Sequence, residues 1–353
     1  MRKLGITMTC ITAVLVLCTV LFGWILGKPA TYGNADGSFR HITARDSFAS
    51  VERHPAFSDF SSFIQPWKDA LNQTVTPRLS MEFVCLQNRT SISSILDGLN
   101  RVVDAQQAGN LTYCDFYTDA ERAAEPDKEE TGLILLHGKP DMPVAVLASG
   151  GAFKSVCLFL EGFPVANKLL EQGYNVAVLK YRVNPNAGGD FDTITAEQGP
   201  IANEDYARAI HFLFDRQKEL GISMDGYSVW GFSAGGRLTS MWGLDNAFGY
   251  AANGLPAPQA MILVYSGWYE PQYEGLYKAM PPTYFAYLPD DDVIGAEYAA
   301  RIPAFIDYLD RQGTPTAFDT YYTAKHGFGE GRGTDAEGWM NHAVAFWLAQ
   351  GVS

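Results

Sequence analysis

The sequence YSVWGFSAGG, residues 227–236, places one serine, Ser233, at the centre of a G-x-S-x-G pattern. This pattern predicts a strand, a sharp turn and a helix start, with the serine at the apex of the turn. Gly231 and Gly235 lack side chains, so two backbones can pass close together there. The Ser233 hydroxyl would then lie at a helix N-terminus, where N–H groups favour a developing negative charge. This arrangement suits nucleophilic catalysis; the alternative is a serine that only caps the helix.

A serine hydroxyl attacks well only when an adjacent base takes its proton and a third group orients that base. His326 lies in KHGFG, a glycine-flanked sequence after a predicted strand, and is the candidate base. His342 falls inside the last predicted helix and is interpreted as structural. The acid is expected after the preceding strand, where Asp290, Asp291 and Asp292 are all candidates. The alternatives are an exposed loop histidine and aspartates that cap turns.

Backbone N–H groups must also stabilise the oxyanion that forms when a serine attacks an ester carbonyl. The residue after the nucleophile, Ala234, is expected to supply one of them. The second is expected from the loop SGGAF, residues 149–153, which follows a predicted strand. Its paired glycines allow the backbone to bend toward the substrate, although an ordinary turn between strand and helix is the alternative.

Apolar runs alternate with amphipathic stretches from about residue 130 onward, which predicts an α/β fold. Near-continuous apolar strands indicate a mainly parallel sheet, of about eight strands, covered by helices on both faces. Ligands of such sheets bind beyond the carboxyl ends of the strands, where the candidate residues lie. The expected strands are 133–136, 144–148, 175–181, 227–230, 261–265, 283–287 and 317–322, and the expected helices are 163–172, 201–219, 235–244, 298–312 and 339–349.

Several short sequences resemble the α/β-hydrolase superfamily, in particular its bacterial esterase/lipase-like branch with acetyl- and feruloyl-esterase-type enzymes. The matching pieces are ASGGAF (148–153), EGFPVA (161–166), GYNVAVL (173–179), the serine turn and HGFG (326–329). The resemblance covers roughly residue 130 to the C-terminus. It implies the α/β-hydrolase fold, with Ser233 as the nucleophile and His326 as the base.

The family's D-D-x-V-V pattern implies that Asp291 is the orienting acid, because an apolar pair follows it after one further residue. The oxyanion loop departs from the family's H-G-G-G motif, since Ser149 replaces the histidine and only two glycines remain. The second oxyanion donor is therefore either Gly151 or Ala152.

Three functions follow from these residues. The first is a serine carboxylic-ester hydrolase that acts on short-chain acyl esters through an acyl-enzyme and needs neither metal nor cofactor. The second is a serine peptidase of the same fold, although the chain has no β-propeller or large lid domain. The third is a non-catalytic binding module, although no member of the triad is missing. Trp268, Tyr269, Tyr273 and Tyr277 could line an acyl or sugar pocket or belong to ordinary packing.

The composition excludes some partners. The 353 residues include 39 acidic and 26 basic side chains, a net charge of −13, which argues against nucleic acid as a partner. The five cysteines show no C-x-x-C spacing, so zinc and thioredoxin-type chemistry lack support. A location outside the cytoplasm would permit a Cys85–Cys114 disulfide.

Residues 4–27 contain no charged side chain, and the stretch is longer than the roughly 20 apolar residues that cross a bilayer. Arg2 and Lys3 precede it, which favours a cytoplasmic N-terminus. We therefore expect residues 1–27 to be a membrane anchor with the catalytic domain extracytoplasmic. If the segment is cleaved, the protein is secreted instead.

The remaining chain is predicted to form one domain after a short connection. Residues 28–50 are rich in Gly, Ser, Asp and Thr and are predicted to be a tether. Residues 51–353 are predicted to be the α/β-hydrolase domain. Within it, residues 51–128 form an N-terminal extension that packs on a core of residues 129–353, because they have too few apolar residues for a core of their own.

Overall fold

The computed structural model describes residues 24–64, 78–87, 89–266, 269 and 271–351. One sheet of eight strands forms its centre. The strands are β1 (Leu111–Cys114), β2 (Gly132–Leu136), β3 (Pro143–Ala148), β4 (Asn175–Lys180), β5 (Ser223–Phe232), β6 (Ala260–Val264), β7 (Thr283–Tyr287) and β8 (Thr316–Thr320).

The strand order across the sheet is β1-β2-β4-β3-β5-β6-β7-β8. Strand β2 is antiparallel to both of its neighbours, β1 and β4. Every pair from β4 to β8 is parallel. Strands β2, β4, β6 and β7 are buried along their whole length, as near-continuous apolar runs predict. The prediction of a mainly parallel sheet of about eight strands is confirmed.

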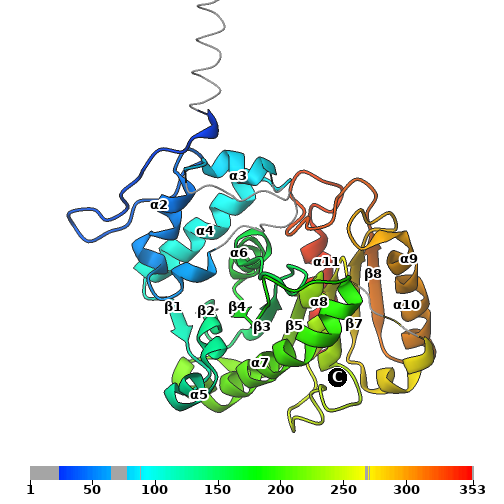
Figure 1. Ribbon diagram of the computed structural model, residues 1–353. Helices are drawn as coiled ribbons and strands as arrows, with labels where there is room; N and C mark the ends of the chain where they lie inside the picture. The colour runs from blue at the N-terminus through cyan, green and yellow to red at the C-terminus, as the bar shows by residue number, and fades with distance from the viewer. Residues whose placement is uncertain (1–23, 65–77, 88, 267–268, 270, 352–353) are drawn as a thin grey trace, which may run out of the picture.

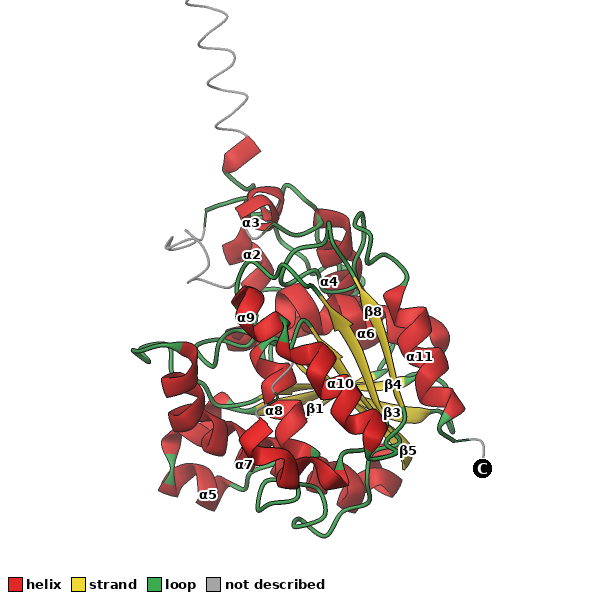
Figure 2. Ribbon diagram, turned by 90° about the vertical axis from the view of Figure 1, so that its right-hand side faces the viewer, coloured by secondary structure: helices red, strands yellow, loops and turns green. Residues whose placement is uncertain are grey.

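Helices cover both faces of this sheet, with α7 and α8 on one side and α11 on the other (Figure 1, Figure 2). Helix α11 packs Trp339 and Trp347 against Trp230 of β5, with ring centroids 5.9 and 6.4 Å apart. The helices are α2 (Phe48–Glu52), α3 (Met81–Gln87), α4 (Ile92–Gln107), α5 (Asp119–Ala124), α6 (Phe163–Gln172), α7 (Phe191–Leu220), α8 (Ala234–Trp242), α9 (Gly295–Ala299), α10 (Arg301–Arg311) and α11 (Trp339–Ala349).

Two predicted helices differ from the observed ones by more than two residues at an end, and each contains a proline. Helix α7 starts ten residues before the predicted residue 201 and contains Pro200, although a proline lacks the N–H that a helix interior uses. The predicted helix 298–312 is split into α9 and α10 at Ala300, since Pro303 lacks the N–H that a continuous helix needs.

The N-terminal extension is built into the sheet. Strand β1 adds an edge strand that the sequence did not predict, because its four residues are only partly buried and carry a weak apolar pattern. Helix α4 packs on α6 at Gly98, where an added Cβ would lie 2.7 Å from the nitrogen of Pro164. Figure 1 shows α2, α3 and α4 gathered on the α6 side of the molecule.

Residues 28–50 do not form the predicted tether. Tyr32, Ile42 and Phe48 are buried, and the Phe48 ring meets that of Phe159 edge to face at 5.9 Å. The polar composition instead forms turns between these buried side chains, so the stretch packs as part of the domain.

The predicted membrane segment lies outside the described residues except for residues 24–27. Within that remainder, Leu26 forms a β-bridge to Leu79. Across the described ranges, no helix combines the length and the apolar character needed to span a bilayer.

Cys85 and Cys114 do not form the disulfide that an extracytoplasmic location would permit. Both are buried free thiols, as is Cys157. Burial raises the pKa of Cys85 to about 12, so its thiol stays protonated.

Candidate active site

Ser233 occupies the turn between β5 and α8. Its backbone has φ of 50° and ψ of −121°, a conformation that is strained for a residue with a side chain. The Ser233 N–H donates to the carbonyl of Val264 on β6 at 3.1 Å. The strained turn therefore holds the hydroxyl beyond the carboxyl end of the sheet.

Two glycines allow this turn, as the sequence predicted. An added Cβ at Gly235 would lie 2.1 Å from the carbonyl oxygen of Ala148 on β3. An added Cβ at Gly231 would lie 2.4 Å from Thr239 Oγ1 and 2.6 Å from the Gly235 oxygen. Side chains at these positions would separate α8 from the strands, so the G-x-S-x-G spacing is a steric requirement here.

His326 lies between Ser233 and Asp291. Its Nε2 is 2.8 Å from Ser233 Oγ, and its Nδ1 is 2.8 Å from Asp291 Oδ2. A carboxylate only accepts hydrogen bonds, so Nδ1 carries the proton and Nε2 accepts from the serine hydroxyl. The side chains of His326 and Asp291 are 5% and 1% exposed, so water does not compete for these bonds.

Three neighbouring strands bring these residues to one edge of the sheet. Ser233 follows β5, Asp291 follows β7 and His326 follows β8. Because these strands are parallel, their carboxyl ends and the loops after them gather together (Figure 1).

The three adjacent aspartates have different surroundings. Asp290 is exposed, whereas Asp291 is buried and also accepts the N–H groups of Val293 and Ile294 at 2.9 Å each. Asp292 accepts the backbone N–H of His326 at 3.3 Å and pairs with Arg89 at 3.1 Å, so it binds no ring nitrogen of His326. Asp291 is therefore the carboxylate that contacts the imidazole ring.

The environment of Asp291 keeps it ionised. Burial acts to raise the pKa of this carboxyl, but the hydrogen bond and charge of His326 and the N–H groups of Ile294 and Val293 lower it below the usual range. An ionised Asp291 can hold the Nδ1 proton of His326 at neutral pH.

The loop 149–153 lies directly against Ser233. An added Cβ at Gly150 would be 2.8 Å from Ser233 Cβ. Gly151 and Ala152 both have positive φ, 129° and 55°, so the loop is sharply bent. Within the described part of the chain, neither of their N–H groups donates to a protein acceptor.

Ala234 is the first residue of α8, a position whose N–H has no partner inside the helix. Ala234 is adjacent to Ser233 in the chain, and Gly151 and Ala152 follow Gly150, which lies against Ser233, so all three N–H groups are candidate oxyanion donors. The structure leaves the two loop candidates as alternatives.

Two further residues at the site, Glu161 and Tyr265, received no role from the sequence. Glu161 lies in a π-helical turn, η4 (Leu158–Gly162), and is 4% exposed. It accepts the Gly150 N–H at 2.6 Å and the Tyr265 hydroxyl at 2.9 Å. The one available signal was a single acid inside the apolar sequence VCLFLEGFPV.

Burial raises the pKa of Glu161, against the opposing effects of the Gly150 N–H, the Tyr265 hydroxyl and the charge of His326. The ring of Tyr265 packs on the ring of His326, with centroids 4.9 Å apart. This second carboxyl therefore contacts the loop 149–153 directly and is linked to the imidazole through the Tyr265 ring.

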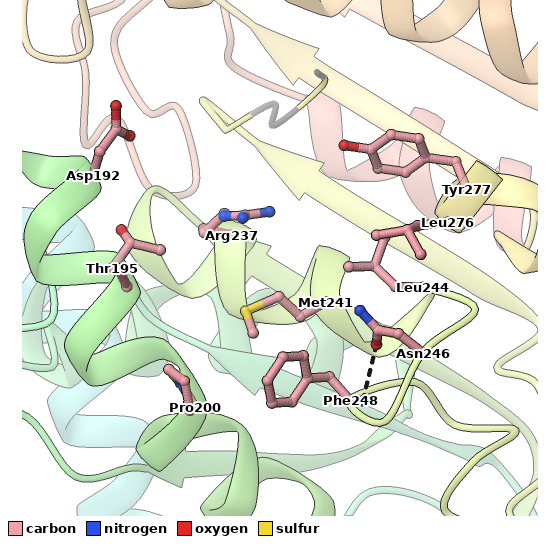
Figure 3. Close-up of a pocket in the computed structure, with 11 residues that line it drawn as sticks. Asp192, Thr195, Pro200, Arg237, Met241, Leu244, Asn246, Phe248, Leu276 and Tyr277 are labelled. Carbon is pink, nitrogen blue, oxygen red and sulfur yellow. Dashed lines mark hydrogen bonds between the residues drawn. The ribbon is translucent and has the colours of Figure 1, made fainter. Parts of the chain in front are cut away.

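A pocket of about 440 Å³ opens beside α8, between α7 and the 3-10 segment η5 (Pro271–Ala279). Figure 3 shows Arg237 and Met241 of α8 facing it. Arg237 lies one turn after Ser233, because its backbone N–H donates to the Ser233 carbonyl at 3.0 Å, whereas Ser233, His326 and Asp291 themselves do not line the pocket. The lining residues are Asp192, Thr195, Ala196, Pro200, Arg237, Met241, Leu244, Asn246, Phe248, Leu276 and Tyr277.

The aromatic residues singled out in the sequence divide between pocket and packing. Tyr277 lines the pocket, whereas Tyr269 stacks on Phe305 with ring centroids 5.3 Å apart. Trp268 and the side chain of Tyr273 lie outside what the structure describes.

His342 lies on α11 and pairs instead with Asp319, at 2.7 Å. In the described ranges, no cluster of His, Cys, Asp and Glu side chains could hold a metal ion.

The chain is similar to known proteins in sequence and in fold. The family model BD-FAE matches residues 134–255, which contain the loop 149–153, Glu161 and Ser233. Comparison with curated proteins gives no match.

Two solved structures share the α/β-hydrolase fold with this chain. One is MGS-M1, an α/β hydrolase enzyme from a Medee basin deep-sea metagenome library, with a TM-score of 0.50, 19% identity, and coverage of 68% of this chain and 97% of that one. The other is esterase 2 of Thermogutta terrifontis, phosphoramylated by tabun, with a TM-score of 0.52, 17% identity, and coverage of 69% and 95%. The predicted α/β-hydrolase fold is confirmed.

Proposed function

We propose that this chain, an esterase-like α/β hydrolase with a BD-FAE domain, is a serine carboxylic-ester hydrolase with Ser233, His326 and Asp291 as its catalytic triad. The observation that carries the proposal is the hydrogen-bonded series of these side chains, with both His326 contacts at 2.8 Å. A base that contacts both the nucleophile and a buried carboxylate is the arrangement that nucleophilic catalysis requires.

In the first step, Ser233 Oγ attacks the ester carbonyl carbon while its proton passes to His326 Nε2. Asp291 stabilises the imidazolium that forms. The carbonyl oxygen becomes an oxyanion, which accepts hydrogen bonds from the N–H of Ala234 and from that of Gly151 or Ala152. When the tetrahedral intermediate collapses, the alcohol leaves with the proton from Nε2, and the acyl group stays on Oγ.

In the second step, water takes the place of the alcohol. His326 Nε2 accepts a proton from the water as its oxygen attacks the acyl carbon. The intermediate then expels Ser233 Oγ, which recovers the proton, and the carboxylic acid is released. Water is the only co-reactant that this sequence of steps consumes.

The pocket beside α8 supports a small substrate group. Its volume of about 440 Å³ lies toward the small end of ligand sites, and Met241 and Phe248 form apolar walls. The buried Thr195 hydroxyl has no hydrogen-bond partner among the described residues and lines the same pocket. We propose that the pocket takes the short acyl group or the alcohol of the ester.

The test is hydrolysis of p-nitrophenyl acetate, butyrate and octanoate by the full chain in detergent. Ser233→Ala should lower kcat by about 10⁴-fold or more, to the background rate. Ser240→Ala is the matched control, because Ser240 lies on the same helix and donates only to the Arg237 carbonyl, at 2.7 Å. Wild-type turnover should be fastest with acetate or butyrate. A folded wild type that hydrolyses none of the three esters would overturn the proposal.

We also propose that residues 1–27 hold the protein at a membrane with the hydrolase domain outside the cytoplasm. The support is the uncharged stretch 4–27 behind Arg2 and Lys3.

A further inference from the structure

Glu161 is a buried acid that the proposed mechanism does not use. It is 4% exposed and lies between the loop 149–153 and the aromatic ring next to His326. A carboxyl in such a place is costly to bury unless both of its oxygens have partners. Here each oxygen has one: Oε2 accepts from Gly150 and Oε1 accepts from Tyr265.

The contact with Gly150 fixes the loop that carries the candidate oxyanion donors. Gly150 lies between Glu161 Oε2 and Ser233 Cβ, because an added Cβ there would be 3.2 Å from the first and 2.8 Å from the second. The Gly150 N–H donates to Glu161 at 2.6 Å. The Gly150 N–H belongs to the peptide plane directly before that of the Gly151 N–H, so this bond fixes the start of the segment that carries the candidate donors.

Backbone hydrogen bonds also anchor Gly150 and Gly151 of this loop. The Gly150 carbonyl accepts from the Cys157 N–H at 2.9 Å, and the Gly151 carbonyl accepts from the Lys154 N–H at 2.9 Å. Glu161 is therefore the anchor of Gly150 that a side-chain substitution can remove while these backbone bonds stay.

The contact with Tyr265 reaches the base. Tyr265 has a positive φ of 35°, follows β6, and donates its N–H to the Ala286 carbonyl at 2.7 Å. Its hydroxyl is held by Glu161, and its ring packs on His326 at 4.9 Å and on Phe328 at 4.7 Å. One carboxyl thus holds the hydroxyl of a ring that packs on the imidazole.

We propose that Glu161 is a positioning residue, which holds the oxyanion loop through Gly150 and the His326 ring through Tyr265. The inference rests on the proposed ester hydrolysis, and it assigns Glu161 no direct contact with the substrate. Its effect should fall on kcat, because the oxyanion and the imidazolium exist only after the ester has bound.

The experiment compares Glu161→Ala, Glu161→Gln and Tyr265→Phe with the wild type on p-nitrophenyl acetate. Rates are divided by the concentration of active sites, titrated to completion with a fluorophosphonate. Glu161→Ala should lower kcat by about 10²-fold and change KM by less than about 3-fold, since a displacement near 1 Å is that costly. Tyr265→Phe should lower kcat by about 10-fold, because it frees the ring and leaves Gly150 anchored.

Glu161→Gln is the rescue variant. Its amide oxygen can accept the Gly150 N–H, and its amide N–H can donate to the Tyr265 hydroxyl, so kcat should return to within about 10-fold of the wild type. Tyr227→Phe is the control for removal of a buried hydroxyl, because Tyr227 lies near the middle of β5, away from the serine turn, and donates to the Pro256 carbonyl at 2.8 Å. It should keep the wild-type kcat and KM.

A purely structural role would lower the melting temperature and leave kcat per active site unchanged. If Glu161→Ala or Tyr265→Phe has the wild-type kcat, the positioning role is wrong. If Glu161→Ala does not fold, the kcat of Tyr265→Phe alone tests the positioning role. Failure of the proposed function looks different, because the wild type itself would then neither hydrolyse the ester nor react with the fluorophosphonate.

Discussion

His326 contacts Ser233 with one ring nitrogen and Asp291 with the other, and the second contact decides which nitrogen holds the proton. If Nε2 carried the proton, it could not accept one from the serine. Asp291 therefore acts by selecting the tautomer of His326 in which Nδ1 carries the proton. Asp292 is adjacent in sequence, but among the described residues it bonds to the backbone N–H of His326 and to Arg89 and not to the ring, so it has no such influence.

Asp291→Asn should lower kcat/KM by about 10⁴-fold, because an amide can donate to Nδ1 and so stabilise the wrong tautomer. Asp292→Asn should change it by less than about 10-fold. Both are measured on p-nitrophenyl acetate with folding checked by circular dichroism. Equal losses in the two variants would contradict the assignment of Asp291.

The sequence predicted residues at the site where chemistry restricts both residue type and spacing. A glycine is required at 235, because an added Cβ there would lie 2.1 Å from the Ala148 oxygen. The base must follow a strand that ends at the same edge of the sheet as the strand before Ser233. The sequence did not decide among Asp290, Asp291 and Asp292 without the resemblance, because adjacent residues in a turn point in different directions. Glu161 was missed because its partners Gly150 and Tyr265 are distant in the chain, so no local spacing shows the contact.

At the scale of elements, the segment that leads to His326 is held by the carboxylate of Asp335, which follows His326 in the chain. Asp335 accepts three backbone N–H groups, from Tyr322, Thr323 and Ala324, at 2.7 to 2.9 Å. Although burial acts in the opposite direction, these donors lower the pKa of Asp335 to about 2. The carboxylate form therefore stabilises the segment that leads from β8 to His326.

The sign of the pH dependence follows from the lowered pKa. The stabilisation by Asp335 is complete above its unfolded pKa of about 3.8 and is lost as the pH falls toward the folded pKa of about 2. Asp335→Asn should lower the melting temperature at pH 7, and the difference from wild type should shrink between pH 4 and pH 2. Thermal melts across this range test it, with Asp225→Asn, an exposed carboxyl, as the control. A difference that is constant with pH would contradict the role of the charge.

The 3-10 segment η5 forms one wall of the pocket and gives a second prediction at this scale. Leu276→Trp should fill space at the pocket, so kcat/KM for butyrate should fall by about 10-fold relative to acetate. Leu348→Trp on the exposed side of α11 is the control and should leave the ratio unchanged. If Leu276→Trp leaves the ratio of kcat/KM for butyrate to kcat/KM for acetate unchanged, the acyl group does not bind in this pocket.

Helices and strands were predicted correctly where the apolar period and the length of a stretch indicate the same element. The prediction failed where tertiary packing determines the structure. Buried strands such as β6 and β7 were found from their apolar runs. Strand β1 was not, because an edge strand of four partly buried residues has little pattern to detect. The polar stretch 28–50 was interpreted as a tether, yet three large side chains within it, Tyr32, Ile42 and Phe48, are enough to fix it on the domain.

At the scale of the whole molecule, the hydrolase core carries an N-terminal extension that joins the sheet through β1 and packs on α6 through α4. Both contacts are inside one hydrophobic core, so the extension and the core should unfold together. The two similar structures each align with under 70% of this chain, so part of the chain has no counterpart in them.

The location proposal also belongs to the whole molecule. In cells that make the full chain, the protein should sediment with membranes, resist extraction by carbonate and be released by detergent. Protease added outside intact cytoplasmic membranes should digest the hydrolase domain. Removal of residues 1–23 should leave a protein that no longer sediments with membranes. A full chain found in the cytosol would contradict the anchor.

The most direct test of the central claim is chemical modification of Ser233. The full chain is treated with a fluorophosphonate, digested, and the modified peptide is mapped by mass spectrometry. The account predicts stoichiometric label on Ser233, loss of esterase activity in proportion, no label in Ser233→Ala, and labelling about 10³-fold slower in His326→Ala. Label on another residue that accounts for the loss of activity, or a folded protein that takes no label, would contradict it.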